Sequence, residues 1–196
     1  MTGENELIAR SRAGDADAFA QLVRRHEDRI YRLVRSVCSS MPAEADDVYQ
    51  ETFLTAFRKL KSFREDSELS TWLYRIASNL CFMRHRRRKR EPFVALLDRP
   101  HGHDHGEGPA HHVADGEPTP EEAAGKKELS AAVAAALSRL PVEYRLVVTL
   151  RDVEQLPAAQ AAKILKLSVP ALKSRLHRGR LFLRAELEKA FASQSS

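Results

Sequence analysis

The feature that most constrains the fold of this chain is a segment, residues 92 to 120, that separates two stretches of helical apolar periodicity. The segment holds five of the nine prolines, four of the eight glycines and five of the eight histidines among 196 residues. It supplies too little apolar material to build a core of its own. We therefore expect an all-α chain with two small helical domains, residues 1–91 and 121–196, joined by a flexible linker over residues 92–120.

Apolar residues recur every three or four positions through the first domain, as they do on the buried face of a helix. This spacing predicts a four-helix unit, with a short first helix that ends near Gly14 and with Pro42 in the first turn of the third helix. Ser70 or Thr71 is expected to cap the fourth helix. The inward face of the third helix is expected to carry Ala45, Val48, Phe53, Leu54, Phe57 and Leu60.

The second domain ends in a helix, a short turn and a basic helix. Pro141 and Pro157 are placed to start helices, and Ser168 is placed to cap the last one, which carries Leu172, Leu176, Leu183 and Leu187 on one side. This order is typical of a helix-turn-helix unit.

The net charge of +5 is modest, but the charges are unevenly distributed. Residues 84 to 90 are all Arg, Lys or His, and residues 139 to 184 contain ten Lys or Arg against three Asp or Glu. Separate basic zones of this kind favour an extended polyanion as partner.

Several classes of protein are disfavoured. Cys38 and Cys81 fall at apolar helical positions without a CxxC pair, so we interpret them as small buried residues in a reducing compartment. No apolar run approaches the roughly 20 residues of a membrane span, and the N-terminus lacks a hydrophobic signal core. The chain is therefore expected to be soluble and cytoplasmic, without membrane insertion. No nucleophile–base pair or phosphate loop points to an enzyme, and no cofactor is expected.

The segment from Asp46 to Arg90 combines three kinds of surface. Its acidic helix is either an ordinary solvated face or a protein-docking surface. The loop after it carries Phe63, which either packs in the core with Trp72 or stacks on an unpaired base. The basic run at its end is a nuclear-type signal, a solvated run or a phosphate clamp, and continuity with the preceding helix favours the clamp.

Four blocks resemble signatures of the sigma-70 superfamily of bacterial transcription initiation factors, in the compact extracytoplasmic-function (ECF) group. They are DDVYQETFLTAF, FREDSELSTWLYRIASN, LPVEYRLVVTLRDVEQL and SVPALKSRLHRGR, in that order. The resemblance covers nearly the whole chain except the linker. It implies a promoter-specificity subunit with a sigma-2 domain, a sigma-4 domain and no catalytic residues.

The resemblance also implies roles for particular residues. The acidic helix would dock on the beta-prime clamp helices of core RNA polymerase through Asp46, Asp47, Gln50, Glu51 and Phe53. The loop and fourth helix would hold melted minus-ten DNA through Lys61, Phe63, Arg64, Asp66, Ser67, Arg75, Asn79, Arg84, Arg86 and Arg87. The last helix would read the minus-thirty-five element of promoter DNA through Arg151, Lys173, Ser174, Arg175, His177 and Arg178, unless these are only solvated charges. The beta flap of the polymerase and a cognate anti-sigma factor are the further partners implied.

Two positions depart from the family pattern. Met83 stands where many relatives carry Asp, four residues after Asn79. After Leu156, relatives often show Ser-Tyr-Glu-Glu-Ile-Ala, whereas residues 157 to 162 here read PAAQAA. We expect the same fold with altered packing or an altered partner surface.

The linker histidines leave several interpretations open. His101, His103 and His105 alternate along the chain and could bind a divalent metal weakly, but a polar linker is the simpler interpretation and no metal site is predicted. A pH response and mimicry of nucleic-acid charge are further alternatives. The rival function for the whole chain is a helix-turn-helix regulator that does not dock on polymerase, which leaves the segment from Asp46 to Arg90 unexplained.

Overall fold

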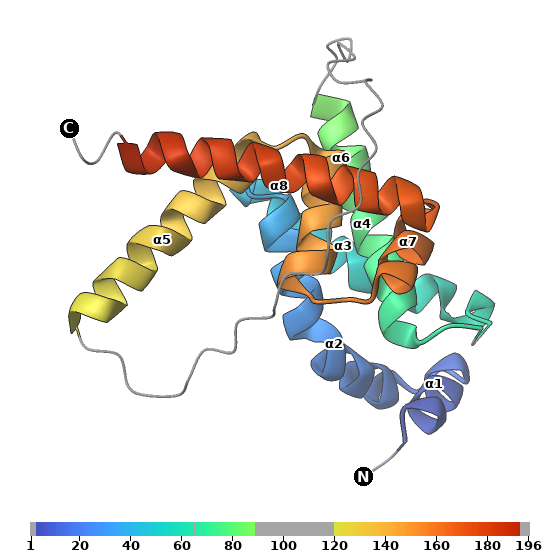
Figure 1. Ribbon diagram of the computed structural model, residues 1–196. Coiled ribbons are helices and arrows are strands. Elements are labelled where there is room, and N and C mark those ends of the chain that lie inside the picture. Colours follow the sequence, from blue (N-terminus) through green and yellow to red (C-terminus); the bar gives the residue numbers. More distant parts are fainter. Residues whose placement is uncertain (1–2, 65, 89–119, 193–196) are drawn as a thin grey trace.

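A computed structural model of the chain describes residues 3–64, 66–88 and 120–192 (Figure 1). All regular structure in these residues is helical, which confirms the expected all-α fold of two small domains. The first domain contains α1 (Glu4–Arg12), α2 (Ala16–Val37), α3 (Pro42–Lys59), the 3-10 turn η1 (Leu60–Ser62) and α4 (Leu69–Arg88). The second contains α5 (Pro120–Arg139), α6 (Val142–Val148), the π-helical segment η2 (Thr149–Val153), α7 (Ala158–Leu165) and α8 (Val169–Ala192).

Local signals set the helix ends in the first domain. The Asp15 carboxylate accepts a hydrogen bond from the Ala18 amide at 2.9 Å and caps α2. This bond, together with Arg10, lowers the pKa of Asp15. Pro42 occupies the first turn of α3, as the sequence predicts. The predicted cap of α4 is wrong, because the helix already begins at Leu69 and Ser70 and Thr71 lie inside its first turn.

The predicted inward face of α3 is only partly right. Ala45, Val48 and Leu60 are buried, but Leu54 and Phe57 are 54% and 48% exposed. The buried row includes Thr52, whose hydroxyl donates to the Val48 carbonyl at 2.7 Å and so satisfies its polar group inside the helix. Because Thr52 is polar, the pattern of apolar residues did not identify its position as buried, and part of the inward face was predicted on the wrong side of the helix.

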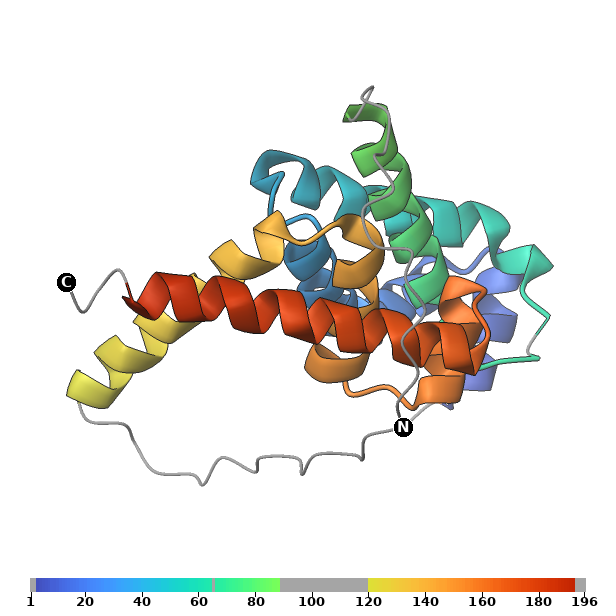
Figure 2. The same cartoon turned by 45° about the horizontal axis from the view of Figure 1, so that its top comes forward.

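The helix-turn-helix of the second domain is confirmed. The helix α7 ends where Lys166 adopts a left-handed conformation with φ of 55°, and Ser168 Oγ then accepts a hydrogen bond from the Ala171 amide at 3.3 Å. Leu172 and Leu176 are buried. The helix α8 continues well beyond this part of the domain, and its C-terminal half runs toward α5 (Figures 1 and 2).

The two domains pack against each other, with α7 beside α4 and α6 against the C-terminal parts of α2 and α4 (Figure 2). We call this contact the domain interface. The Glu154 side chain, only 2% exposed, lies at its centre. It accepts a hydrogen bond from the Tyr74 hydroxyl at 2.6 Å and pairs with Arg32 Nε at 3.2 Å. Burial raises the pKa of Tyr74, and the neighbouring Glu154 raises it further. The phenol therefore stays protonated and donates the hydrogen bond.

A second buried charge, Arg145 of α6, crosses the same interface. It is 2% exposed and donates to the Val37 carbonyl at 2.7 Å and to Ser40 Oγ at 3.1 Å. It also donates to the carbonyls of Ser138 and Leu140 in its own domain. Burial lowers the pKa of Arg145, and these four acceptors compensate the guanidinium for lost water.

No helix in the described part of the chain is long and apolar enough to cross a lipid bilayer.

Gly179 is expected to be essential to the packing of α8 on α6. A Cβ at this position would lie 2.8 Å from Val148 Cγ2, and a β-branched side chain inside a helix cannot easily rotate away. We predict that Gly179→Ala destabilises the protein by about 1–3 kcal/mol, although alanine is the better helix former by about 1 kcal/mol. Urea unfolding measures the change.

Val148→Ala supplies the matched control. The double variant Gly179→Ala/Val148→Ala removes the clashing methyl group, so it should be more stable than the sum of the two single effects predicts. Additive losses would show that the close contact does not limit the stability of this helix pair.

Candidate functional site

The helix α3 presents the acidic surface that the sequence predicts. Asp46, Asp47 and Gln50 are exposed, and Glu51 is partly buried and pairs with Arg84 Nη2 at 3.1 Å. Phe53 does not belong to this surface, because its ring is 8% exposed and packs edge-on against Tyr49. This burial agrees with the inward face that the apolar periodicity predicts for Phe53, and a direct part of Phe53 in docking stays a prediction.

Two apolar side chains that sequence reasoning assigned to the core take its place on this surface. Leu54 and Phe57 are about half exposed, and the Phe57 ring meets Phe19 edge-on with 4.9 Å between ring centroids. They follow Asp47 and Gln50 at spacings of three and four residues, so the four side chains form one stripe along the helix. We call these four residues the α3 stripe. The sequence already contains this spacing, because Ala45, Val48, Thr52 and Ala56 follow the same helical repeat on the opposite, buried side of α3.

The loop after α3 is anchored to the core by its aromatic residue. Phe63 is 5% exposed, and its ring lies 5.2 Å from that of Trp72. The guanidinium of Arg12 lies 5.9 Å from the centre of the Phe63 ring and also donates to the backbone carbonyls of Phe63 and Leu60. Phe63 is therefore not available to stack on a base in this arrangement, and the core alternative for it is correct.

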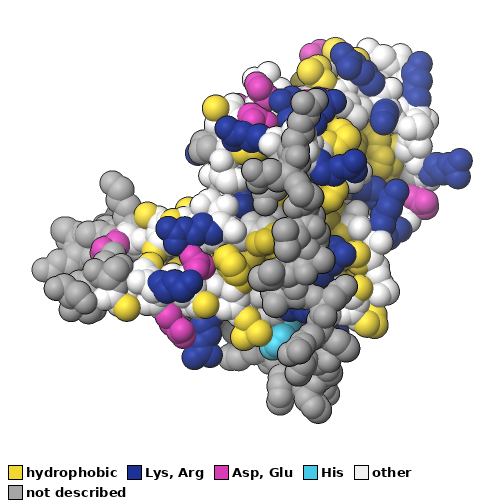
Figure 3. Space-filling view, turned by 90° about the horizontal axis from the view of Figure 1, so that it is seen from above, with side chains coloured by type: hydrophobic (Ala, Val, Ile, Leu, Met, Phe, Trp, Pro, Cys, Tyr) yellow, Lys and Arg dark blue, Asp and Glu magenta, His cyan; other side chains and the backbone are white. Residues whose placement is uncertain are grey.

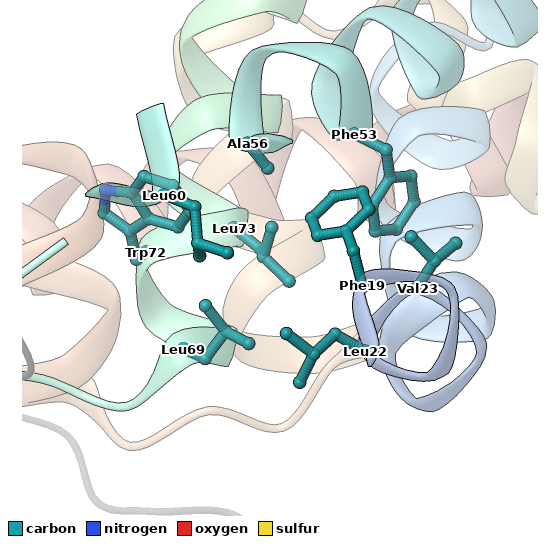
Figure 4. A pocket seen from close by; sticks show the side chains of 9 residues that line it. All are labelled: Phe19, Leu22, Val23, Phe53, Ala56, Leu60, Leu69, Trp72 and Leu73. Atoms are coloured by element: carbon teal, nitrogen blue, oxygen red, sulfur yellow. The ribbon is translucent and has the colours of Figure 1, made fainter. Parts of the chain in front are cut away.

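The core behind this loop is nearly solid. Side chains from α2, α3, η1 and α4, including Phe19, Phe53, Leu60 and Trp72, converge on a cavity of about 10 Å³ (Figure 4). That is about the room of one water molecule. The cavity cannot hold a base or a small ligand, so function in this region belongs to the surface.

Four polar side chains of the loop face solvent instead. Lys61, Arg64 and Asp66 are exposed, and Ser67 is partly exposed. Such groups can donate to and accept from the edges of an unstacked base. Glu65 is outside the described residues.

The basic residues of α4 divide between two sides of the helix. Arg75, Asn79 and Arg86 follow the helical repeat along one side, and Arg87 is exposed near them. Arg84 lies on the other side, where its hydrogen bond to Glu51 raises its pKa. In this arrangement Arg84 therefore pairs with the acidic helix, and its assignment to the nucleic-acid surface stays a prediction. The last two residues of the basic run, at positions 89 and 90, are outside the described residues.

One face of the molecule combines basic and apolar side chains. Figure 3 shows Lys and Arg spread over this face, with fewer Asp and Glu and with hydrophobic side chains between them. This mixture fits an extended polyanion better than a single compact anion.

The exposed side of α8 carries the predicted recognition residues. Lys173, Ser174 and His177 are exposed, and Arg175 and Arg178 are partly buried. Leu172 and Leu176 of the same helix are buried. Lys, Ser and Arg at the start of the second helix of a helix-turn-helix can reach base edges and phosphates in a major groove. The five lie within two turns of one helix, and Lys173, Ser174 and His177 share its exposed side.

Arg151 is held differently. It is partly buried in η2, and its guanidinium donates to the Leu156 carbonyl in the turn before α7. One of its N–H groups is therefore used inside the domain, where Arg151 supports the turn.

The domain interface covers part of the surface that the sequence predicts for nucleic acid on the first domain. Lys163 Nζ of α7 donates to the Asp66 carbonyl at 3.2 Å, and Arg75 Nη2 donates to the Lys163 carbonyl at 3.4 Å. Gln160 Nε2 donates to Thr71 Oγ1 at 2.8 Å. The loop and the first turns of α4 are thus in contact with α7, and an extended ligand cannot lie across them until α7 moves away.

Metal binding finds no support among residues 3–64, 66–88 and 120–192, which contain no cluster of three or more His, Cys, Asp or Glu able to hold an ion. His101, His103 and His105 lie outside these residues, so the linker alternative stays untested.

Both domains match known families. Residues 22–91 match Sigma-70 region 2, and residues 130–183 match Sigma-70, region 4. The chain is 37% identical to the ECF RNA polymerase sigma factor SigW of Bacillus subtilis, over 92% of this chain and 94% of that protein. It is 38% identical to the ECF RNA polymerase sigma factor SigM of Mycobacterium tuberculosis, over 89% of this chain and 80% of that protein.

Two solved structures have a similar fold. One is CnrH in complex with the cytosolic domain of CnrY, with a TM-score of 0.64, 29% identity and coverage of 93% of this chain and 96% of that chain. The other is the sigma factor RpoE in complex with the anti-sigma factor NepR from Bartonella quintana, with a TM-score of 0.62, 24% identity and coverage of 87% and 96%. The second likeness bears on the fold alone.

Arg12 is predicted to hold the loop of residues 61–67 in place. Arg12→Gln removes the guanidinium from the Phe63 ring and leaves the carbonyls of Leu60 and Phe63 without this donor. Hydrogen bonds to a charged group contribute about 1.5–3 kcal/mol, so amide hydrogen exchange in the loop should accelerate roughly tenfold or more.

Arg10→Gln is the control, because Arg10 pairs with Asp15 on the exposed side of the same helix. Its effect on the loop amides should be negligible. Unchanged exchange in the Arg12 variant would contradict the anchoring role.

Proposed function

The chain belongs to the ECF group of the sigma-70 family of RNA polymerase sigma factors, and we propose how its two domains divide promoter recognition. The first domain docks on core polymerase through the acidic side of α3 and holds melted minus-ten DNA with the loop and α4. The second domain reads the minus-thirty-five element with Lys173, Ser174, Arg175, His177 and Arg178. The domain limits 1–91, 92–120 and 121–196 are those of the proposal.

The α3 stripe is the proposed centre of polymerase docking. Its half-exposed Leu54 and Phe57 are flanked by Asp46, Asp47 and Gln50, and an apolar centre with a polar rim is the usual anatomy of a protein interface. The acidic charge also repels DNA, which directs nucleic acid to the other side of the domain. The beta-prime clamp helices are the proposed partner, and the beta flap is the proposed partner of the second domain.

Capture of the minus-ten element is proposed to depend on polar groups. Because Phe63 is buried, base recognition falls to Lys61, Arg64, Asp66 and Ser67 of the loop and to Asn79 of α4. Arg75, Arg86 and Arg87 are proposed phosphate contacts. Each hydrogen bond to a base edge contributes about 0.5–1.5 kcal/mol.

Melting itself requires the polymerase. Opening about ten base-pair steps costs roughly 14 kcal/mol at about 1.4 kcal/mol per step. The capture of one or two bases cannot offset this cost, so the sigma factor nucleates melting only as part of the holoenzyme.

The domain interface implies a conformational step in this function. Lys163 bonds the Asp66 carbonyl and accepts from Arg75, and both of these partners belong to the proposed minus-ten surface. We infer that the domains separate when the sigma factor joins the polymerase, because both DNA surfaces must then be open at once.

A cognate anti-sigma factor is a further proposed partner. The chain is 29% identical to CnrH, which was solved with the cytosolic domain of CnrY. Leu54 and Phe57 offer an apolar surface that such a protein could cover. Occupying the α3 stripe would block polymerase by competition.

The remaining parts of the proposal concern the class and place of action. The protein acts by binding and not by catalysis, and it acts in the cytoplasm, where polymerase and promoter DNA are found. A regulator that uses only the second domain is not favoured, because residues 22–91 match Sigma-70 region 2.

The observation that carries the proposal is the presence, in one chain, of both matched regions with their exposed polar surfaces. The test is transcription with purified core polymerase on a promoter library. Promoter-dependent RNA should appear only when the protein is added. No RNA product, with a positive control sigma factor active on the same core enzyme, would contradict the proposal.

Leu54→Glu is predicted to abolish polymerase docking without unfolding the domain. The side chain is 54% exposed, so the folded protein can hydrate the new charge, whereas an interface would have to bury it. Truncating or charging an interface anchor costs about 2 kcal/mol or more, so the affinity for core polymerase should fall at least roughly 30-fold. Fluorescence anisotropy with labelled protein measures it.

Leu129→Glu is the matched control. Leu129 is 49% exposed in α5 and lies outside both matched regions. It should bind core polymerase like the parent protein. Equal affinity of the Leu54 variant would remove the α3 stripe from the docking surface.

Arg178→Ala is predicted to weaken promoter use chiefly through the upstream element. An Arg contact to a base edge discriminates by about 1–3 kcal/mol. Holoenzyme containing the variant should lose about tenfold or more of its activity on a promoter with an intact minus-thirty-five element, and much less where that element is scrambled.

Arg184→Ala is the control for charge. Arg184 lies further along α8, is exposed and pairs with Glu188 at 2.8 Å. It should change activity little on either promoter. Equal loss by the Arg178 variant on all DNA, including nonspecific DNA, would show that Arg178 touches only phosphates.

A further inference from the structure

The two cysteines of the chain lie in direct contact. Cys38 follows the last residue of α2, Cys81 lies in the middle of α4, and their sulfur atoms are 3.2 Å apart. Both thiols are free and both residues have 0% exposure. The sequence correctly predicts two buried residues, but it does not predict that 43 positions of separation end in one sulfur pair.

The pair is chemically asymmetric. The two sulfur atoms lie within hydrogen-bond distance at 3.2 Å, and this contact lowers the pKa of Cys38 while it raises the pKa of Cys81. The positive charge of Arg145 acts in the same direction on Cys38. Cys38 is thus the better thiolate, and Cys81 is placed to react with whatever forms on Cys38.

The second domain covers this pair. The helix α6 packs against both α2 and α4. Its Arg145 donates to the Val37 carbonyl and to Ser40 Oγ, which lie on either side of Cys38 in the chain. Arg145 is itself 2% exposed, so it is enclosed together with the two thiols.

We propose that Cys38 and Cys81 form a peroxide-responsive dithiol that is shielded by α6 and oxidises to a disulfide when the domains separate. The oxidant class is a hydroperoxide, with hydrogen peroxide as the smallest member. Opening of the domain interface withdraws Arg145 and α6 and gives the peroxide access to the Cys38 sulfur.

The chemistry balances in two steps. The Cys38 thiolate attacks one peroxide oxygen, the O–O bond breaks, and the hydroxide released takes a proton to give water and a sulfenic acid on Cys38. The Cys81 sulfur then attacks the Cys38 sulfur, its proton passes to the departing hydroxyl group, and a second water leaves. Two thiols and one peroxide give one disulfide and two waters, with both cysteine sulfurs oxidised and both peroxide oxygens reduced.

The first experiment treats the purified full-length protein with hydrogen peroxide and follows it by intact mass and peptide mapping. We expect a monomer lighter by two hydrogen atoms, with the Cys38 peptide joined to the Cys81 peptide and with reversal by a dithiol reductant. Persistent free thiols, or stepwise addition of oxygen without a cross-link, would overturn the proposal.

The second experiment tests the order of attack with single variants and dimedone, which traps sulfenic acids. Cys81→Ala should leave Cys38 labelled after peroxide, whereas Cys38→Ala should leave Cys81 unlabelled or labelled at least about tenfold more slowly. Equal or reversed labelling would overturn the assignment of Cys38. Serine variants at the same positions repeat the test if an alanine variant does not fold.

The third experiment tests the cover. Glu154→Ala removes the partner of Tyr74 and Arg32 and loosens the domain interface away from the sulfur atoms. Disulfide formation should accelerate by about tenfold, in proportion to the gain in open population. Arg180→Gln, which breaks the pair with Asp152 inside the second domain, should leave the rate unchanged.

Equal rates in the parent protein and the Glu154 variant would overturn shielding by the second domain. None of these measurements needs polymerase or a promoter, so their outcome is independent of the transcription test.

Discussion

The arrangement of the two domains depends on one buried carboxylate. Glu154 has lost nearly all contact with solvent and is held by the Tyr74 hydroxyl and the Arg32 guanidinium, both from the other domain. An unpaired charge at such a site would be strongly destabilising. The three groups therefore stabilise the interface together, and water can hydrate each of them when they part.

Polar contacts supplement the apolar packing between the two domains and would ease the proposed opening. Arg145, Gln160 and Lys163 all contact backbone or hydroxyl groups of the first domain, and each contact can be exchanged for a contact with water. A partner that binds the open form more tightly shifts the balance in proportion to that difference in affinity. In the proposed function polymerase is such a partner, and promoter DNA would add to the shift by competing with α7 for Asp66 and Arg75.

The sequence predicts the helices well because most of their information is local. The cap at Ser168 and the proline at the start of α3 depend on residues within one turn, and periodicity identifies the buried row of α8. Periodicity fails where a polar residue is buried because its hydroxyl bonds to the backbone of its own helix, as in Thr52. For this reason Leu54 and Phe57 were assigned to the wrong side of α3. It also cannot reveal that Arg84 pairs with Glu51, or that Arg12 holds Phe63, because these partners lie 33 and 51 positions apart. The five proposed recognition residues of α8 could be grouped from the sequence because a single helix holds all of them.

The departure from the family pattern after Leu156 has a physical reason in the domain interface. Gln160 stands where the pattern has Glu, and its amide donates to Thr71 Oγ1 while it lies 3.5 Å from the Glu68 carboxylate. A carboxylate at this position could not donate and would be repelled by Glu68. Ala161 and Ala162 are buried at 0% and 3%, where small side chains let α7 approach its neighbours closely. Gln160 is therefore the departing residue that bonds α7 to α4, and its neutral amide makes this contact compatible with an acidic loop.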